Sequence, residues 1–153
     1  MPEDKDILLK DILEDKVDNK YFLSKENISF MNGYWGKTTR WVKMKNSLNG
    51  KSQTICASFY KGLPRGVIIL DYVLEQTLHK GSICSVHKEK SKVIRRLTPV
   101  ECERLQTLPD NYTKYGIFGN GKIKQISDTQ RYKTIGNAWT VDVIAWIFSF
   151  LKI

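Results

Sequence analysis

The sequence predicts an α+β fold, in which a small mixed region of strands and loops precedes a group of C-terminal helices. Residues 31–66 look like loops and short strands, whereas the last third of the chain carries two clear helix-start signals, at Thr98 and Ser127. The 153 residues are 41% hydrophobic, enough to bury the core of one domain or of part of a larger one. No apolar run approaches the ~20 residues that span a bilayer, and the N-terminus is unlike a signal peptide. We therefore expect a cytoplasmic protein without a membrane partner.

Elements of the first two thirds follow from the spacing of apolar residues. Ile7, Leu8, Leu9, Ile12 and Leu13 recur at helical spacing, which predicts a short amphipathic helix over residues 5–15. Strands are predicted at residues 53–60, 81–86 and 92–97, and the apolar run at 67–74 fits either a strand or a buried helix.

Capping residues define the C-terminal helices. Thr98 is a cap, Pro99 suits the first helical position, and Glu101 completes a capping box, so a helix should run to about residue 107. A second helix should start after Ser127 and end at Gly136 or Asn137, and a third should follow from residue 140.

The last predicted helix is unusually apolar. Between residues 141 and 153 only Asp142, Ser149 and Lys152 are polar, and they form one narrow stripe. A helix that is apolar on its other sides has to be buried on most of its surface. It packs either on the helix at 98–107 and the strands before it, or on a larger fold to which this chain contributes.

Positive charge is concentrated in one segment. The net charge is +9, yet residues 1–30 carry five lysines against eight acids, whereas residues 31–66 carry seven basic residues and no acid. This segment also contains Tyr34, Trp35, Trp41, Phe59 and Tyr60. Basic and aromatic side chains together suit a surface that binds nucleic acid, but a solvated lysine-rich loop region has the same composition.

Cysteine and histidine give no sign of a metal site. The three cysteines are an odd, widely spaced set without a CxxC pair, which argues against disulfides and structural zinc. His79, Cys84 and His87 fall close together but lack a fourth ligand and any standard spacing. We expect no bound metal.

Two long motifs resemble those of a known enzyme family. Residues 95–110, RRLTPVECERLQTLPD, resemble the ninth motif of the cytosine-C5 DNA methyltransferases, and residues 130–141, QRYKTIGNAWTV, resemble the tenth. Weaker likenesses at residues 9–24 and 53–62 are similar to parts of the family's target-recognition region. The resemblance implies a DNA-binding target-recognition region at residues 1–92. It also implies that residues 93–153 pack on the catalytic domain of an α/β S-adenosylmethionine-dependent methyltransferase fold.

The family's catalytic motifs have no counterpart in these residues. The family attacks cytosine C6 with the thiolate of a Pro-Cys loop, whereas Cys56, Cys84 and Cys102 here follow Ile55, Ile83 and Glu101. We therefore expect no catalytic residue in this chain and no activity from it alone. The resemblance implies an N-terminal catalytic chain as partner, with S-adenosylmethionine shared between the two.

Further site residues are carried over from the resemblance. Flanking the cofactor would be Asn137, Ala138 and Trp139, with Gly136 allowing a tight turn. A polar scaffold would consist of Arg95, Thr98, Glu101, Arg104 and Gln106, although Arg104 also fits a solvated helix position. Contacts to double-stranded DNA are expected from Arg40, Lys51, Thr54, Ser58, Lys61 and Arg65.

Three hypotheses follow for the function. The first is the C-terminal part of a bacterial or phage-encoded DNA (cytosine-5-)-methyltransferase, acting in restriction-modification, phage self-protection or regulation. The second is a non-catalytic DNA-binding or regulatory remnant of such an enzyme. The third is a decaying gene fragment without a stable fold.

Overall fold

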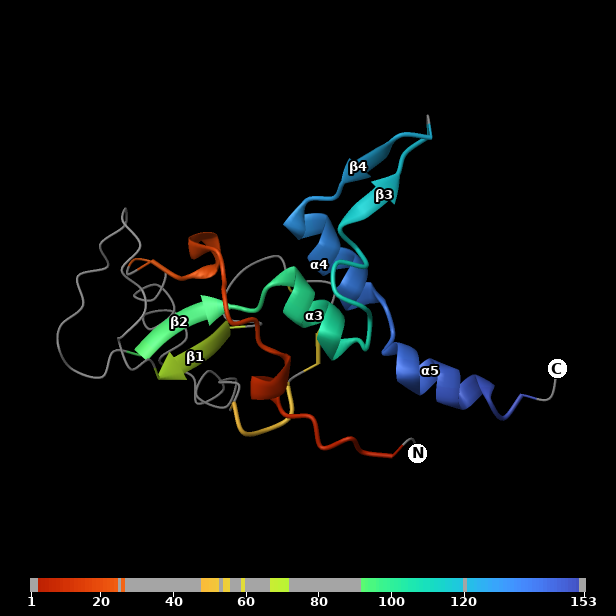
Figure 1. Ribbon diagram of the computed structural model, residues 1–153, viewed down its shortest axis with the longest axis horizontal. Helices are drawn as coiled ribbons and strands as arrows, with labels where there is room; N and C mark the ends of the chain where they lie inside the picture. Colours follow the sequence, from red (N-terminus) through yellow and green to blue (C-terminus); the bar gives the residue numbers. More distant parts are fainter. Residues whose placement is uncertain are drawn as a thin grey trace.

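The computed structural model describes residues 3–24, 26, 48–52, 54–55, 59, 67–71, 92–119 and 121–151. Its elements, in chain order, are the 3-10 helices η1 (Leu9–Ile12) and η2 (Asn19–Tyr21), the strands β1 (Val67–Asp71) and β2 (Lys92–Arg96), the helix α3 (Pro99–Leu105), the strands β3 (Tyr115–Ile117) and β4 (Ile123–Gln125), and the helices α4 (Asp128–Asn137) and α5 (Val141–Phe148) (Figure 1). No helix within these ranges is long and apolar enough to cross a membrane.

Strands β1 and β2 form an antiparallel pair in which Val67 lies opposite Arg96 and Asp71 lies opposite Lys92. The prediction of a strand at 92–97 is confirmed. The described part of the apolar run at 67–74, Val67–Asp71, is a strand rather than a buried helix. The strand predicted at 81–86 lies outside the described residues. Of the strand predicted at 53–60, Thr54, Ile55 and Phe59 are described, and none of them is in a strand.

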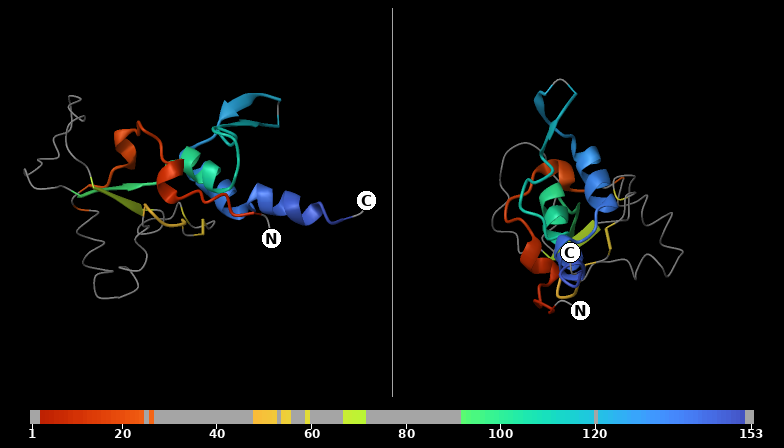
Figure 2. Two further views of the ribbon diagram at one scale, coloured as in Figure 1. Left: turned by 60° about the horizontal axis from the view of Figure 1, so that its bottom comes forward. Right: turned by 90° about the vertical axis from the view of Figure 1, so that its right-hand side faces the viewer.

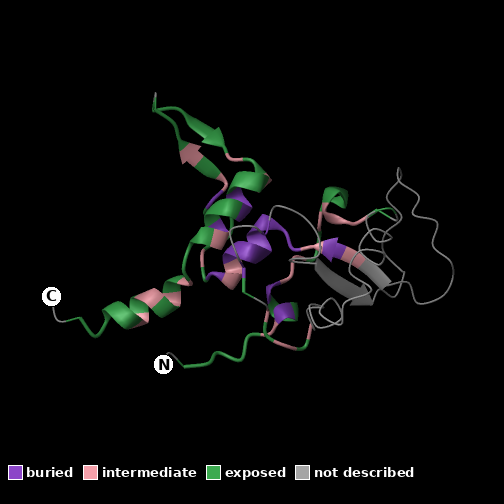
Figure 3. Cartoon of the chain, turned by 180° about the vertical axis from the view of Figure 1, so that it is seen from behind, coloured by how far each residue is buried: buried purple, intermediate pink, exposed green. Residues whose placement is uncertain are grey.

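One apolar core joins the N-terminal segment to the C-terminal helices. Helix α3 lies at its centre and contacts both η1 and α4 (Figure 3). Tyr132 of α4 packs against Phe59, with ring centroids 5.3 Å apart, and its hydroxyl donates to the Leu97 carbonyl at 2.7 Å. The buried members are Leu9, Ile12, Ile55, Phe59, Leu97, Cys102, Tyr132 and Ile135. The core therefore draws on residues far apart in the sequence.

The helix predicted over residues 5–15 is wrong except for one short 3-10 turn. Asp6 has a φ of 54°, a left-handed conformation that interrupts a right-handed helix. The amides of Leu9 and Lys10 donate to the carbonyls of Gly50 and Leu48 instead of to their own segment. Tertiary hydrogen bonds thus replace the local helix, and Leu9 and Ile12 keep the three-residue spacing that buries both.

The predicted helix starts at Thr98 and Ser127 are confirmed. Thr98 accepts a hydrogen bond from the Glu101 amide, and the Glu101 side chain bonds the Thr98 amide in return, completing the capping box. Ser127 likewise accepts from the Gln130 amide, and α4 ends at Asn137 as predicted. Helix α3 ends at Leu105, two residues before the predicted limit, and Thr107 takes a φ of 56°.

Helix α5 differs from its prediction in length and in burial. It ends at Phe148 rather than continuing to residue 153, and Ser149 Oγ donates to the Trp146 carbonyl at 2.6 Å just beyond it. None of its residues is buried, so the interpretation that this tail packs on the chain's own core is wrong. Figures 1 and 2 show α5 extending away from the body, at the end opposite β1 and β2.

The β3–β4 hairpin was not predicted. It pairs Tyr115 with Gln125 and Ile117 with Ile123, and it projects from the body beyond α4 (Figure 1). A turn signal was present in the sequence, because Asn120-Gly121 stands between two short segments that each contain an isoleucine.

Candidate functional site

The residues expected at the cofactor lie at the junction of α4 and α5. Asn137 is the last residue of α4, Ala138 caps it in an extended conformation, and Trp139 follows with 71% of its surface exposed. Gly136 is helical and lies within α4, so the expectation that it makes a tight turn is wrong. The chain turns instead through the extended residues that link the two helices.

Gln106 holds this junction in place through hydrogen bonds. Its buried side chain donates from Nε2 to the Ile135 carbonyl at 3.2 Å, and its Oε1 accepts from the Thr140 hydroxyl at 2.9 Å. Its own carbonyl accepts from the Val141 amide at 3.1 Å. One residue at the end of α3 therefore fixes the last turn of α4 and the first residues of α5.

Neighbouring Thr107 adds a second anchor for α5. Its hydroxyl accepts from the Asp142 amide at 3.0 Å, while Lys5 pairs with the Asp142 carboxylate at 2.8 Å. The hydrogen bond to Lys5 holds the pKa of Asp142 below its usual value.

Polar groups on the junction are available to a ligand. Among the described residues, neither the Asn137 side-chain amide nor the Trp139 indole N–H has a hydrogen-bond partner, and both residues are exposed. The junction thus presents an amide and an aromatic ring two residues apart in the sequence, on a backbone that Gln106 holds in place.

An open apolar groove runs from the junction along α5. Its volume is about 430 Å³, and its lining residues are Trp139, Val141, Ile144, Ala145 and Phe148. Further large apolar side chains of the same segment are exposed, namely Val143, Ile147, Phe150 and Leu151. A monomer rarely leaves such a continuous apolar surface in water, which makes this face a candidate interaction site.

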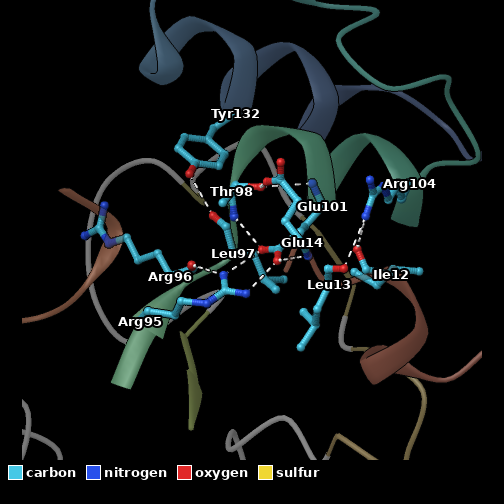
Figure 4. Close-up of polar contacts among 10 residues, drawn as sticks. All are labelled: Ile12, Leu13, Glu14, Arg95, Arg96, Leu97, Thr98, Glu101, Arg104 and Tyr132. Atoms are coloured by element: carbon cyan, nitrogen blue, oxygen red, sulfur yellow. Dashed lines mark hydrogen bonds and ion pairs between the residues drawn. The ribbon is translucent and has the colours of Figure 1, made fainter. Parts of the chain in front are cut away.

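A buried ion pair ties β2 to α3 (Figure 4). Arg95, 2% exposed, donates to both carboxylate oxygens of Glu101, from Nη1 to Oε2 at 2.8 Å and from Nη2 to Oε1 at 2.6 Å. Glu101 also accepts from the amides of Thr98 at 2.7 Å and Glu14 at 2.9 Å, and the Thr98 hydroxyl donates to the Glu14 carboxylate. Each charged group has several partners, which offsets the cost of burying it.

Arg104 is fixed rather than solvated. Its Nε and Nη2 donate to the two carboxylate oxygens of Asp110 at 2.8 and 2.6 Å. Its Nη1 donates to the Ile12 carbonyl at 2.9 Å (Figure 4). This pairing lowers the pKa of Asp110. Arg104 therefore connects η1 to the segment that follows α3.

A second buried ion pair was missed from the sequence. Glu103 accepts from the amides of Asn111 and Thr113 at 2.7 and 2.8 Å, from the Thr113 hydroxyl, and from Arg131 Nη2 at 2.9 Å. Burial acts to raise the pKa of Glu103, but the hydrogen bonds from Thr113 and Arg131 outweigh it and hold the pKa below its ordinary value. Nothing in local spacing marks this pair, because its members lie 28 residues apart.

Of the residues expected to contact DNA, the structure describes Lys51 and Thr54, which are both exposed. Lys51 pairs with Asp4 across 2.6 Å at the surface, a contact that is weak in water. The others, Arg40, Ser58, Lys61 and Arg65, lie outside the described residues.

Cys102 lies in the core and is fully buried. Burial, and then the charges of Glu101 and Glu103, raises the pKa of its thiol well above the ordinary value, so the reactive thiolate is disfavoured. Cys56, Cys84, His79 and His87 lie outside the described residues. Within the described ranges, no three His, Cys, Asp or Glu side chains converge on a metal position.

Comparison with known sequences places these features in a family context. A family model described as C-5 cytosine-specific DNA methylase matches residues 1–152. The chain is 31% identical to the type II methyltransferase M.SsoII of Shigella sonnei, over 88% of this chain and 29% of that protein. It is also 31% identical to the DNA N-6-adenine-methyltransferase of Escherichia phage P1, over 43% of this chain and 12% of that protein. The chain thus spans less than a third of the length of either relative.

Solved structures show the same arrangement of elements. The methyltransferase EhMeth of Entamoeba histolytica superposes with a TM-score of 0.60 at 19% identity, covering 98% of this chain and 43% of that one. The Dnmt2 methyltransferase of S. pombe superposes with a TM-score of 0.56 at 16% identity, covering 97% and 42%. Both likenesses agree with the predicted α+β fold class of a methyltransferase.

Proposed function

This chain belongs to the C-5 cytosine-specific DNA methylase family, and from that premise we propose that it forms the C-terminal part of a DNA (cytosine-5-)-methyltransferase. The reaction is methyl transfer from S-adenosylmethionine to C5 of cytosine in duplex DNA. Residues 1–92 supply target recognition and residues 93–153 close the catalytic domain. The observation that carries the proposal is the exposed apolar face of α5, which is built to be covered.

An N-terminal catalytic chain is the proposed occupant of that face. Burying a large apolar side chain is worth about 1.5–3 kcal/mol, and Ile147, Phe148, Phe150 and Leu151 are all exposed. The partner also brings the nucleophile, because Cys102 is buried and protonated, and neither Cys56 nor Cys84 follows a proline.

The α4–α5 junction fits one side of the cofactor site. When bound, S-adenosylmethionine supplies the electrophilic methyl group. Asn137 offers an exposed amide, and Trp139 offers an aromatic ring against which a flat ring can stack. The groove beside them is apolar throughout, so the charged end of the cofactor needs groups from the partner chain. In this arrangement Gln106 positions the junction and does not touch the cofactor.

Recognition of DNA falls to the basic segment at residues 31–66, which includes Lys51 and Thr54. Lysine and arginine there hold phosphates or read base edges, and Arg40, Ser58, Lys61 and Arg65 belong to the same proposal. The scaffold residues Arg95, Thr98, Glu101 and Arg104 attach β2 and the N-terminal segment of the proposed recognition region to α3 through their hydrogen bonds.

Co-expression tests the proposal. The chain is expressed with the N-terminal catalytic fragment of a cytosine-C5 methyltransferase whose own C-terminal part has been deleted. Protection of plasmid DNA from a methylation-sensitive restriction enzyme is then scored. We expect protection only when both chains are present, and turnover by this chain alone would refute the division of labour.

Matched substitutions locate the docking face. Ile147→Glu places a charge on α5, where we expect loss of protection, while Ile7→Glu changes a similarly exposed isoleucine on the N-terminal segment and should leave protection intact. If both chains are soluble but never protect DNA, while this chain still binds duplex DNA, the non-catalytic remnant is favoured instead.

A further inference from the structure

The β3–β4 hairpin is a regular antiparallel ribbon, with hydrogen bonds that continue past its paired strands. Beyond its paired strands, the Ile126 amide donates to the Lys114 carbonyl at 2.9 Å and the Phe118 amide to the Lys122 carbonyl at 3.0 Å. Gly121 turns the chain with a φ of 72°, a conformation that favours glycine. A Cβ at Gly116 would meet Ile126 Cδ1 at 2.9 Å, so a larger residue there would make the Ile126 side chain shift. The protrusion seen in Figures 1 and 2 therefore has a defined shape.

The two faces of the ribbon differ in chemistry. The register places Tyr115, Ile117, Ile123 and Gln125 on one face. Because successive residues of a strand alternate in direction, Lys124 and the flanking lysines Lys114 and Lys122 belong to the other face. Lys124 Nζ lies 5.5 Å from the ring centre of Phe118, which by alternation shares this face. Lys114 Nζ, by contrast, lies 5.7 Å from the ring centre of Tyr115, a residue of the other face. By their positions the three lysines make this the more basic side of the ribbon, which also carries Phe118 and Ile126.

The hairpin segment has no carboxylate of its own. Residues 111–126 contain three lysines and neither Asp nor Glu. The acids that flank the hairpin are already engaged, Asp110 by Arg104 and Asp128 by Lys20. Among the ion pairs of the described residues, none includes Lys114 or Lys124.

We propose that the β3–β4 hairpin is a second DNA-contacting element, whose lysine face holds the phosphate backbone of the duplex. This inference rests on the proposed function, because it takes double-stranded DNA as the ligand. An acid-free basic face complements a polyanion, and a two-stranded ribbon is narrow enough to follow or enter the major groove. Phosphate contacts carry no sequence information, so the hairpin adds affinity and orientation while the recognition region selects the site.

The test measures binding of the full chain to fluorescent duplexes of about 30 base pairs. One duplex is A·T-rich and one is G·C-rich, and anisotropy is followed between about 50 and 200 mM salt. The Lys114→Gln, Lys122→Gln and Lys124→Gln triple variant should bind both duplexes at least about tenfold more weakly at the low-salt end. Its plot of log affinity against log salt should be shallower by about 2.7, from roughly 0.9 per phosphate contact.

Two further variants separate charge from structure. Replacing the same lysines with arginine keeps the charge and should restore affinity and salt slope. Ile117→Thr with Ile123→Thr changes the opposite face with a strand-forming residue and should leave DNA binding within about twofold of wild type.

Each other outcome overturns the inference. If the glutamine triple variant binds like wild type, the hairpin is not a DNA contact, while the proposed function stands. If the isoleucine variant instead loses association with the catalytic fragment and the glutamine variant keeps full DNA affinity, the hairpin is a protein contact. If the wild-type chain binds neither duplex, both the hairpin inference and the proposed recognition role fail.

Discussion

Glu103 illustrates how a buried charge can stabilise the site from a distance. Its carboxylate accepts from four donors, contributed by Asn111, Thr113 and Arg131, and so connects α3 to the segment that leads into the hairpin and to α4. Removing one member of a buried pair leaves the other charge without compensation, whereas breaking an exposed pair costs little. Residues at the base of the hairpin therefore depend on this single side chain.

Glu103→Gln should lower the free energy of unfolding by about 3–5 kcal/mol, because Arg131 would stay buried without its carboxylate. Asp110→Asn is the matched control, since its pair with Arg104 is half-exposed and should cost about 0–1 kcal/mol. Urea denaturation followed by circular dichroism measures both. Equal losses in the two variants would show that the burial of Glu103 has no special weight.

Acid should destabilise the chain partly through Glu103. Its folded pKa lies below the ordinary value, so its contribution is fully present above the unfolded pKa of about 4.3 and is lost as the pH falls through the folded pKa. The urea midpoint of the wild type should thus fall more steeply than that of Glu103→Gln as the pH is lowered below about 4.3. Parallel curves for the two proteins would exclude this linkage.

At the scale of single elements, α3 is the one that most others depend on. Its capping box joins β2 through Arg95 and the N-terminal segment through Glu14, while its C-terminal end holds α4 and α5 through Gln106. Loss of its N-cap should therefore loosen several segments together.

Thr98→Ala should lower the free energy of unfolding by about 0.5–2 kcal/mol, because the Glu101 amide loses its acceptor. Thr98→Ser keeps the hydroxyl and should retain most of the stability. Thermal unfolding of the two variants compares them directly. A serine variant as unstable as the alanine variant would assign the role to the methyl group instead.

Deleting residues 141–153 should improve the solubility of the lone chain, since α5 exposes a large apolar face and buries none of its residues. Sedimentation of lysates and a thermal unfolding curve measure solubility and fold together. A truncated chain that no longer unfolds cooperatively would show that α5 stabilises the core after all.

Elements with strong local signals could be predicted from the sequence, and those set by tertiary contacts could not. The Thr98 and Ser127 caps depend on residues three positions apart and were read directly. The helix expected over residues 5–15 failed because the amide of Leu9 bonds Gly50, which local spacing cannot reveal. Within the site, the Asn137–Trp139 junction came from a motif, whereas the Glu103–Arg131 pair and the support from Gln106 depend on distant partners.

On the scale of the whole molecule, the charge is unevenly distributed. The first 30 residues are acidic, the next 36 contain no acid, and the hairpin adds a second acid-free segment near the other end of the sequence. A protein that binds a polyanion through such segments releases counterions, so its affinity depends on salt.

The affinity of the full chain for duplex DNA should fall at least about tenfold between ~50 and ~200 mM salt. Fluorescence anisotropy at a series of salt concentrations gives the slope. At each salt concentration, Lys51→Glu, which reverses the charge, should bind duplex DNA more weakly than the wild type does. Thr129→Glu, on the exposed first turn of α4, should have a smaller effect on the affinity. Affinity that is indifferent to salt would contradict an electrostatic mode of binding.

The side chain of Gln106 also couples α4 to α5. Its amide nitrogen donates to the Ile135 carbonyl in the last turn of α4, and its amide oxygen accepts from the Thr140 hydroxyl just before α5. A partner that binds α5 and changes its orientation would therefore also move the residues between the two helices. Under the proposed function, binding of the catalytic chain to α5 and the position of Asn137 and Trp139 beside the cofactor are therefore coupled. A partner bound in the wrong orientation would leave these two residues misplaced.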